Sequence, residues 1–115
     1  VENNETTIMA GLNCASVSTL AWNILKNGLS GSMSISDELS EEAMRILAYP
    51  ISGDPTIISG ESGASGLGGL IGLSTSTKYK DFKEKFNLNK SSTVLVINTE
   101  GNTDPINYKK VMDNA

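Results

Sequence analysis

The sequence predicts an α/β fold, in which a mostly parallel open sheet carries helices on both faces. Segments with apolar residues at helical spacing alternate along the chain with short apolar segments of strand length. The clearest strand is Thr93–Ile97, a continuous run of β-branched residues and leucine of the kind that forms buried parallel strands. The chain has 115 residues, the length of one domain, and contains neither an internal repeat nor a long linker.

The first half of the chain predicts two helices separated by a short strand. Apolar residues recur at helical spacing in Ser18–Asn27, and Gly28 follows as a stop signal. Ser32–Ile35 alternates small polar and apolar residues, which is typical of a short strand. A second helix then begins at Ser36 or Asp37, either of which can cap it. Its predicted buried face consists of Leu39, Ala43, Ile46 and Leu47.

The second half begins with a short apolar strand, Thr56–Ser59, and a glycine-rich helix, Glu61–Leu73. Ala64, Gly68 and Gly72 stand four apart in this helix and therefore lie on one face. Each glycine weakens a helix by about 1 kcal/mol relative to alanine, so a helix with several glycines needs a compensating reason. We expect this face to allow close approach of another backbone or of a ligand.

Two further helices are expected towards the end of the chain. Lys78–Phe86 has the spacing of an exposed amphipathic helix. Asp104 can cap a last helix that has Pro105 at its first position. At the other end of the chain, Val1–Glu5 is polar and acidic, which is typical of a frayed terminus rather than of a signal peptide.

Composition excludes several classes of function. The net charge of −4 gives no attraction to nucleic acid or to an anionic membrane, and the uncharged stretch Ser62–Thr77 is too short and too polar to span a bilayer. The chain has no histidine, which removes the usual general base and most zinc sites, so no metal centre is predicted. The single cysteine, Cys14, cannot form an intrachain disulfide, which fits the reducing cytoplasm.

Three loops are the candidate functional sites, because ligands of parallel sheets bind beyond the carboxyl ends of the strands. They are Met9–Cys14, Ser59–Ala64 and Asn98–Thr103. In Ser59–Ala64 the start of a helix offers free backbone N–H groups, which favour an anion, and Gly63 permits close approach. The alternative is a packed helix start with Glu61 as its capping carboxylate.

The other two loops carry weaker signals. Asn98–Thr103 is rich in short polar side chains that can hold a ring nitrogen or a hydroxyl group; alternatively it is a plain polar turn with Asp104 as a cap. In Met9–Cys14 no basic neighbour is close enough in sequence to activate Cys14 as a nucleophile, so a role as a small hydrophobe is expected. The residues alone therefore describe a soluble α/β segment with three ligand loops.

Several stretches of the chain resemble one enzyme family. They are TIMAGLNC (Thr7–Cys14), LAWNIL (Leu20–Leu25), DPTIISGESGA (Asp54–Ala64), and VLVINTEGNTDP (Val94–Pro105) together with Tyr108. These stretches are similar to the diaminopropionate ammonia-lyases, which are pyridoxal-phosphate enzymes of fold type II. The resemblance runs from about Thr6 to the end of the chain, and the phrases IISGESGA and TEG-TDP are specific to this family. A looser resemblance to threonine dehydratases and serine racemases supports it.

The resemblance implies an activity that the residues alone do not. Members of the family catalyse the α,β-elimination of 2,3-diaminopropionate to pyruvate and ammonia with pyridoxal 5'-phosphate. The imine lysine, the glycine-rich phosphate loop and the acid/base carboxylates are expected upstream of the matched region. Residues 1–115 would therefore be the C-terminal portion of the enzyme, a single partial domain without catalytic residues and inactive alone. The family also suggests a homodimer for the full-length enzyme.

The resemblance also implies which residues face the cofactor and the substrate. Glu61 would lie near the cofactor ring, with Ser62 and Gly63 packed beside it. The substrate loop would consist of Met9, Ala10 and Gly11. Ala10 stands where the dehydratases have aspartate, and the lyases share this alanine.

One departure from the family concerns the contact to the cofactor ring nitrogen. The family usually has serine at position 98 and aspartate at position 102, where this chain has Asn98 and Asn102. Either Asn98 or Thr99 could make the contact, and the sequence leaves both open. Two other hypotheses stay open as well: a sibling enzyme of the same fold that acts on serine or threonine, and a binding or regulatory module without chemistry.

Overall fold

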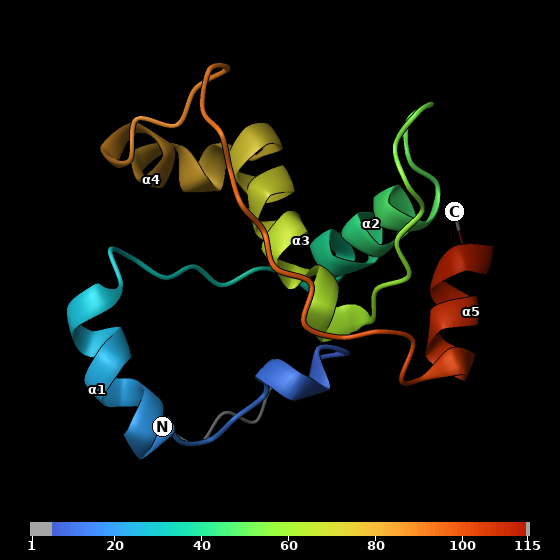
Figure 1. Ribbon diagram of the computed structural model, residues 1–115, viewed down its shortest axis with the longest axis horizontal. Coiled ribbons are helices and arrows are strands. Elements are labelled where there is room, and N and C mark those ends of the chain that lie inside the picture. The colour runs from blue at the N-terminus through green and yellow to red at the C-terminus, as the bar shows by residue number, and fades with distance from the viewer. Residues whose placement is uncertain (1–5, 115) are drawn as a thin grey trace.

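The computed structural model describes residues 6–114, so the frayed terminus expected at Val1–Glu5 lies outside the described residues. The elements in chain order are η1 (Ala10–Leu12), α1 (Thr19–Gly28), α2 (Asp37–Ala48), α3 (Glu61–Thr75), η2 (Thr77–Tyr79), α4 (Lys80–Lys85) and α5 (Pro105–Asp113) (Figure 1). Within residues 6–114 no helix is both long enough and apolar enough to cross a membrane.

The cap predicted for the last helix is observed, whereas the one expected at Ser36 or Asp37 is not, because α2 has no side-chain cap hydrogen bond. The Ser18 side chain accepts a hydrogen bond from the backbone N–H of Ala21 and so caps α1. The Asp104 carboxylate accepts from two backbone N–H groups at the start of α5, and Pro105 occupies the first helical position. Local residue chemistry therefore determines these boundaries.

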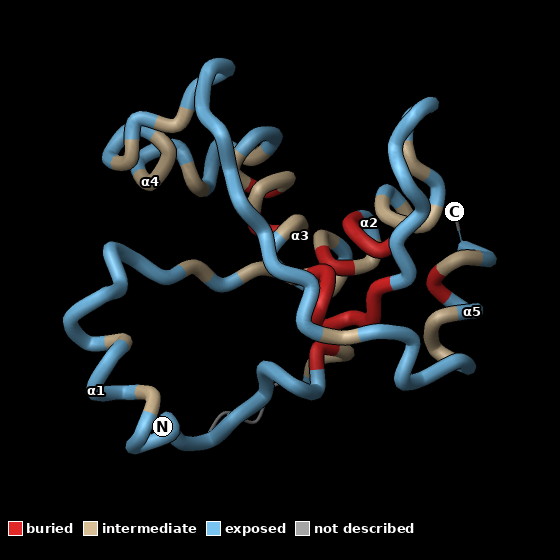
Figure 2. Tube along the Cα trace, in the orientation of Figure 1, coloured by how far each residue is buried: buried red, intermediate tan, exposed pale blue. Residues whose placement is uncertain are grey.

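The core lies where α3 crosses α2, and Figure 2 shows the buried residues gathered there. The predicted small-residue face of α3 is confirmed, since Ala64, Gly68 and Gly72 are all buried. A Cβ atom added at Gly68 would lie 2.8 Å from the backbone carbonyl oxygen of Leu39 in α2. The two helix backbones can approach this closely only because that position has no side chain.

The buried face of α2 differs in part from the predicted one. Ala43 is buried as predicted, but Ile46 is 44% exposed, whereas Ser40 and Met44 are fully buried. Ser40 can be buried because its hydroxyl donates to the backbone carbonyl of Glu61 at 2.5 Å, which satisfies the polar group. The buried stripe is therefore shifted towards α3, and a small serine lies where a larger apolar residue would hold the helices apart.

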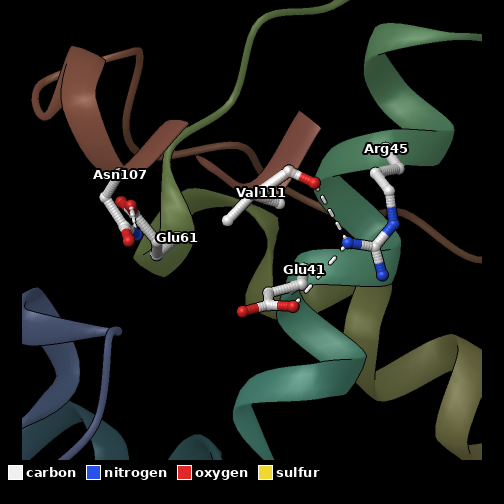
Figure 3. A network of polar contacts seen from close by, with 5 residues as sticks. All are labelled: Glu41, Arg45, Glu61, Asn107 and Val111. Carbon is white, nitrogen blue, oxygen red and sulfur yellow. Dashed lines mark hydrogen bonds and ion pairs between the residues drawn. The ribbon is translucent and has the colours of Figure 1, made fainter. Parts of the chain in front are cut away.

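Helix α5 packs against the other side of the same core. The Arg45 guanidinium in α2 donates to the Val111 carbonyl oxygen at 3.3 Å, and it also pairs with Glu41 at 3.7 Å (Figure 3). Val111 itself is buried in the core cluster with Ala43 and Met44. The last turn of α5 is thus attached to α2 by both apolar and polar contacts.

The predicted parallel sheet is not confirmed, because residues 6–114 contain no strand. The three segments expected to form strands were Ser32–Ile35, Thr56–Ser59 and Thr93–Ile97. The last of these runs past α3 as an irregular segment, with Leu95 86% exposed rather than buried (Figure 1). A strand exists only when a neighbouring backbone pairs with it, and high β propensity does not supply that neighbour.

The remaining helices lie outside the core. Helix α1 stands apart from the other helices (Figure 1). Of the apolar residues at helical spacing in it, Leu20 is 85% and Ile24 75% exposed, while Ala21 and Leu25 are half-buried. The helix expected at Lys78–Phe86 is divided into η2 and α4. The Tyr79 hydroxyl donates to the Ser34 carbonyl at 2.8 Å and so attaches this region to the segment before α2.

Two glycines of α3 should respond oppositely to alanine. We expect Gly68→Ala to lower the free energy of unfolding by about 1–3 kcal/mol, because its Cβ would overlap the α2 backbone. Gly66→Ala is the matched control in the same helix, because its Cβ would meet only Val96 at an ordinary 3.7 Å. It should raise the free energy of unfolding by about 0.5–1 kcal/mol through helix propensity. Urea unfolding of both variants measures this, and equal effects would contradict the close packing of α2 on α3.

Candidate functional site

The three candidate loops meet at the start of α3. The backbone N–H of Gly11 donates to the Ser62 hydroxyl oxygen at 3.0 Å, which joins the first loop to the second. The backbone N–H of Ser62 donates to a carboxylate oxygen of Glu100 at 2.9 Å, which joins the second loop to the third. Segments that are far apart in the sequence therefore form one polar cluster at this helix end (Figure 1).

The second loop, Ser59–Ala64, lies at the centre of the cluster and is buried throughout. At Gly63 it is the third loop that approaches closely, since a Cβ there would lie 2.7 Å from the Glu100 carbonyl oxygen. The expectation of free N–H groups for an anion is wrong at Ser62, because its N–H is bound by the Glu100 carboxylate. An internal carboxylate thus occupies the position where an external anion would bind.

The Glu61 carboxylate points away from this polar cluster. Glu61 is buried, and its Oε1 accepts a hydrogen bond from the side-chain amide of Asn107 in α5 (Figure 3). The alternative in which Glu61 caps its own helix is not observed either, because α3 has no side-chain cap. In this chain the Glu61 side chain joins α3 to α5.

The third loop presents two polar side chains to solvent, Asn98 and Thr99. The Asn98 amide oxygen accepts from the Ser59 hydroxyl at 2.9 Å and from the Glu100 backbone N–H at 3.2 Å. Both lone pairs of that oxygen are used, so the amide NH₂ is the group that Asn98 offers outward. Neither this NH₂ nor the Thr99 hydroxyl has a hydrogen-bond partner among residues 6–114.

The first loop is held by a carboxylate at the start of α2. One oxygen of Asp37 accepts from the Thr7 hydroxyl and the other accepts from the Ile8 backbone N–H at 3.1 Å. Met9 is buried beyond this point, while Ala10 and Gly11 are exposed. Asp37 therefore sets the position from which the exposed part of the loop projects.

Cys14, at the end of the first loop, is exposed and free, and its sulfur lies 3.8 Å from the Gly11 carbonyl oxygen. The expected packing of Cys14 as a small hydrophobe is not observed, because the residue is exposed. Among residues 6–114 no group of three or more acidic or cysteine side chains lies close enough together to hold a metal ion.

An open groove of about 1000 Å³ lies beside the cluster. Its walls include the exposed segment Val94–Ile97, the residues before α2, and Ser65, Gly66 and Gly69 of α3. Of the residues predicted to face cofactor or substrate, only Met9 lines this groove. The first loop therefore reaches the groove through Met9, Leu12 and Asn13, whereas no residue of the second or third loop lines it.

Sequence reasoning missed three residues that organise the cluster. Glu100 joins the second and third loops, Asp37 holds the first loop, and Ser59 orients the Asn98 amide. The sequence marks Asp37 only as a possible helix cap and Glu100 only as part of a family motif. Glu100 could have been found from its place inside a segment of short polar residues. A carboxylate there can accept several loop hydrogen bonds at once.

Comparison with known proteins gives one consistent set of relatives. Diaminopropionate ammonia-lyase of Escherichia coli K12 is 45% identical over 106 residues, which cover 92% of this chain and 27% of that protein. The Salmonella typhimurium LT2 protein of the same name is 40% identical over 116 residues, covering 100% of this chain and 29% of that protein. No family model matches the chain.

Solved structures agree with the sequence relatives. The Escherichia coli diaminopropionate ammonia-lyase in complex with an aminoacrylate–PLP azomethine reaction intermediate superposes with a TM-score of 0.83 at 44% identity. That match covers 94% of this chain and 28% of the solved chain. The same enzyme in complex with D-serine superposes with a TM-score of 0.79 at 43% identity.

The structural match covers nearly all of the chain, so the three loops belong to a backbone arrangement that these enzymes share. The resemblance carried by the loop motifs is confirmed. The chain is therefore homologous, over nearly its whole length, to a segment that makes up about a quarter of a diaminopropionate ammonia-lyase.

Proposed function

We propose that this chain forms one wall of the pyridoxal-phosphate site in a lyase that converts 2,3-diaminopropionate to pyruvate and ammonia. The observation that carries the proposal is the meeting of the three loops at the start of α3. These are the loops that hold the motifs shared with the lyases, and a relative with this backbone arrangement was solved with a PLP reaction intermediate. Pyridoxal phosphate, when bound, supplies the electron sink for α-proton removal and loss of the β-amino group.

Asn98 provides the donor that fits the cofactor ring. An unprotonated pyridine nitrogen accepts a hydrogen bond, so it needs a neutral donor rather than a carboxylate. The Asn98 amide oxygen is already occupied by Ser59 and Glu100, which leaves its NH₂ group directed outward. Because no comparable contact fixes the Thr99 hydroxyl within residues 6–114, we assign the ring contact to Asn98 rather than to Thr99.

The other predicted site residues take supporting roles in this proposal. Ser62 and Gly63 form the buried floor under the ring, because both are small and packed against the third loop. Glu61, whose carboxylate is bound by Asn107, keeps the start of α3 in place rather than contacting the cofactor. The exposed part of the first loop, Ala10 and Gly11 with buried Met9 behind it, faces the substrate.

The chain would act as part of a larger enzyme. It spans 27% of the Escherichia coli relative, and the imine lysine, phosphate loop and acid/base carboxylates implied by the resemblance are assigned to the remainder. We propose that residues 1–115 form the C-terminal portion of a cytoplasmic homodimeric enzyme. The lone cysteine is compatible with a reducing compartment, and the exposed apolar face of α1 offers area for a contact with the rest of the assembly.

A second candidate is a sibling enzyme that acts on a hydroxy amino acid. It is favoured by one observation, the solved complex of an Escherichia coli relative with D-serine. Against it stands Ala10, which matches the lyases where the dehydratases carry aspartate. A third candidate, a binding or regulatory module, has no specific contact in its favour.

The choice of substrate is tested by product formation. The full-length enzyme is expected to show the visible absorbance of pyridoxal phosphate and to release pyruvate faster from 2,3-diaminopropionate than from serine or threonine. A coupled pyruvate assay with the three amino acids measures this. A clear preference for serine or threonine would favour the second candidate. The absence of cofactor absorbance would exclude both pyridoxal-phosphate enzymes.

The ring contact is tested by paired substitutions in the third loop. In the full-length enzyme Asn98→Asp keeps the shape of the side chain but replaces the outward NH₂ donor by an acceptor. Turnover should fall by about tenfold or more, since one hydrogen bond contributes about 1 kcal/mol or more and 1.4 kcal/mol corresponds to a factor of ten. The cofactor absorption maximum should shift at the same time.

Asn102→Asp is the matched control, because it adds the same charge to the same exposed loop at a position without an assigned contact. It should leave turnover and the spectrum close to those of the unmodified enzyme. If the variants at positions 98 and 102 behave alike, the assignment of the ring contact to Asn98 is wrong.

The isolated 115-residue chain should bind pyridoxal phosphate weakly, because the opposite half of the cofactor site is assigned to the rest of the enzyme. A fluorescence titration of the chain with the free cofactor measures the dissociation constant. A value of about 1 µM or below, equivalent to about 8 kcal/mol of binding free energy, would show that this wall suffices and would contradict the division of the site.

A further inference from the structure

Glu100 has all of its polar groups engaged within the loop cluster. One carboxylate oxygen accepts from the Ser62 N–H at 2.9 Å, and the other accepts from the Thr103 hydroxyl at 2.7 Å. Its backbone N–H donates to the Asn98 amide oxygen at 3.2 Å, and its carbonyl accepts from the Gly60 N–H at 3.1 Å. No other residue among 6–114 joins the second and third loops through both its main chain and its side chain.

The position of this carboxylate is electrostatically favourable. The first backbone N–H groups of a helix lack partners within the helix and carry partial positive charge. The Ser62 N–H is one of these groups at the start of α3, and a hydrogen bond from it to a carboxylate is charge-assisted. Glu100 therefore satisfies a backbone N–H at the buried start of α3 with a group that comes from the third loop.

The same residue controls the orientation of Asn98. The Asn98 amide oxygen is held between the Ser59 hydroxyl and the Glu100 N–H, and this pair of contacts decides which end of the amide faces outward. Without the hydrogen bond from the Ser62 N–H to the Glu100 carboxylate, this side chain would no longer connect the third loop to α3. The Asn98 NH₂ group would then no longer have a fixed direction.

We infer that Glu100 is a positioning residue, which holds the third loop on the start of α3 and thereby aims the Asn98 donor at the cofactor ring. This inference rests on the proposed function. In this inference the important carboxylate of the site is Glu100, which acts without contacting the cofactor. The sequence had instead suggested Glu61 as an acidic residue beside the ring.

The test uses the full-length holoenzyme with substitutions at position 100. Glu100→Ala removes both carboxylate acceptors, whereas Glu100→Gln keeps an oxygen for the Ser62 N–H and an NH₂ that can donate to the Thr103 oxygen. Three quantities are measured: the dissociation constant of free pyridoxal phosphate, the absorption maximum of the bound cofactor, and hydrogen exchange of the Ser59–Ala64 segment.

The alanine variant is expected to bind pyridoxal phosphate about tenfold more weakly, because a charge-assisted hydrogen bond is lost. It should also shift the cofactor absorption maximum and exchange amide protons faster in Ser59–Ala64. The glutamine variant should restore cofactor affinity to within about threefold. Rescue of the spectrum by glutamine would not be expected from a residue that only contributes to overall stability.

Glu41→Ala is the matched control, because it removes a carboxylate that pairs with Arg45 in α2 rather than with any of the three loops (Figure 3). It should change neither the spectrum nor the cofactor affinity. If Glu100→Ala does not fold, Glu100→Asp takes its place. Its shorter side chain keeps the charge but cannot reach Ser62 and Thr103 together, so the same spectral shift is expected.

Two results would overturn the inference. The first is an unchanged spectrum and cofactor affinity in Glu100→Ala while the unmodified enzyme binds the cofactor and releases pyruvate. The second is an equal loss in the alanine and glutamine variants, which would show that the negative charge matters rather than the hydrogen bonds that hold the third loop on α3. If the unmodified enzyme itself neither binds the cofactor nor releases pyruvate, the proposed function fails and the inference falls with it.

Discussion

The close packing of α3 on α2 is the constraint on which the rest of the structure depends. It requires a glycine at position 68, where an added Cβ would lie 2.8 Å from the Leu39 carbonyl oxygen, and a small buried serine at position 40. The Ser40 hydroxyl also donates to the Glu61 carbonyl in the first turn of α3, which adds a hydrogen bond between the two helices. The small side chains thus bring the start of α3 to a fixed place against α2, which is where the loops converge.

Once the start of α3 is fixed, the polar contacts of the loops follow from the need to satisfy its backbone. Glu100 satisfies this backbone by accepting from the Ser62 N–H, while Asp37 at the start of α2 fixes the residues before the first loop. Among the exposed groups of the loops are the neutral Asn98 NH₂, the Thr99 hydroxyl and the backbone of Ala10 and Gly11. In the proposed function these neutral donors face an aromatic ring with an unprotonated nitrogen.

Local chemistry allowed most of the helical structure to be predicted. Asp104 marks a helix start because a short polar side chain can accept the first backbone N–H groups, and this cap is observed. The small-residue face of α3 was also predictable, since three small residues spaced four apart share a face. The sheet was not predictable in this way, because β-branched residues such as those in Thr93–Ile97 indicate only that a segment can pair, whereas pairing needs a neighbouring backbone.

The sequence by itself determined the helices, the close-approach face of α3, the three loops and the family whose motifs they carry. Only the tertiary structure decided which acidic residue connects the loops. The Glu61 side chain accepts from Asn107 in α5, while Glu100 accepts from the Ser62 N–H. It also decided that Asn98 presents its NH₂ group outward. The physical reason is that helix caps and periodicity depend on neighbours along the chain, whereas the direction of a polar side chain depends on which partners the fold brings within about 3 Å.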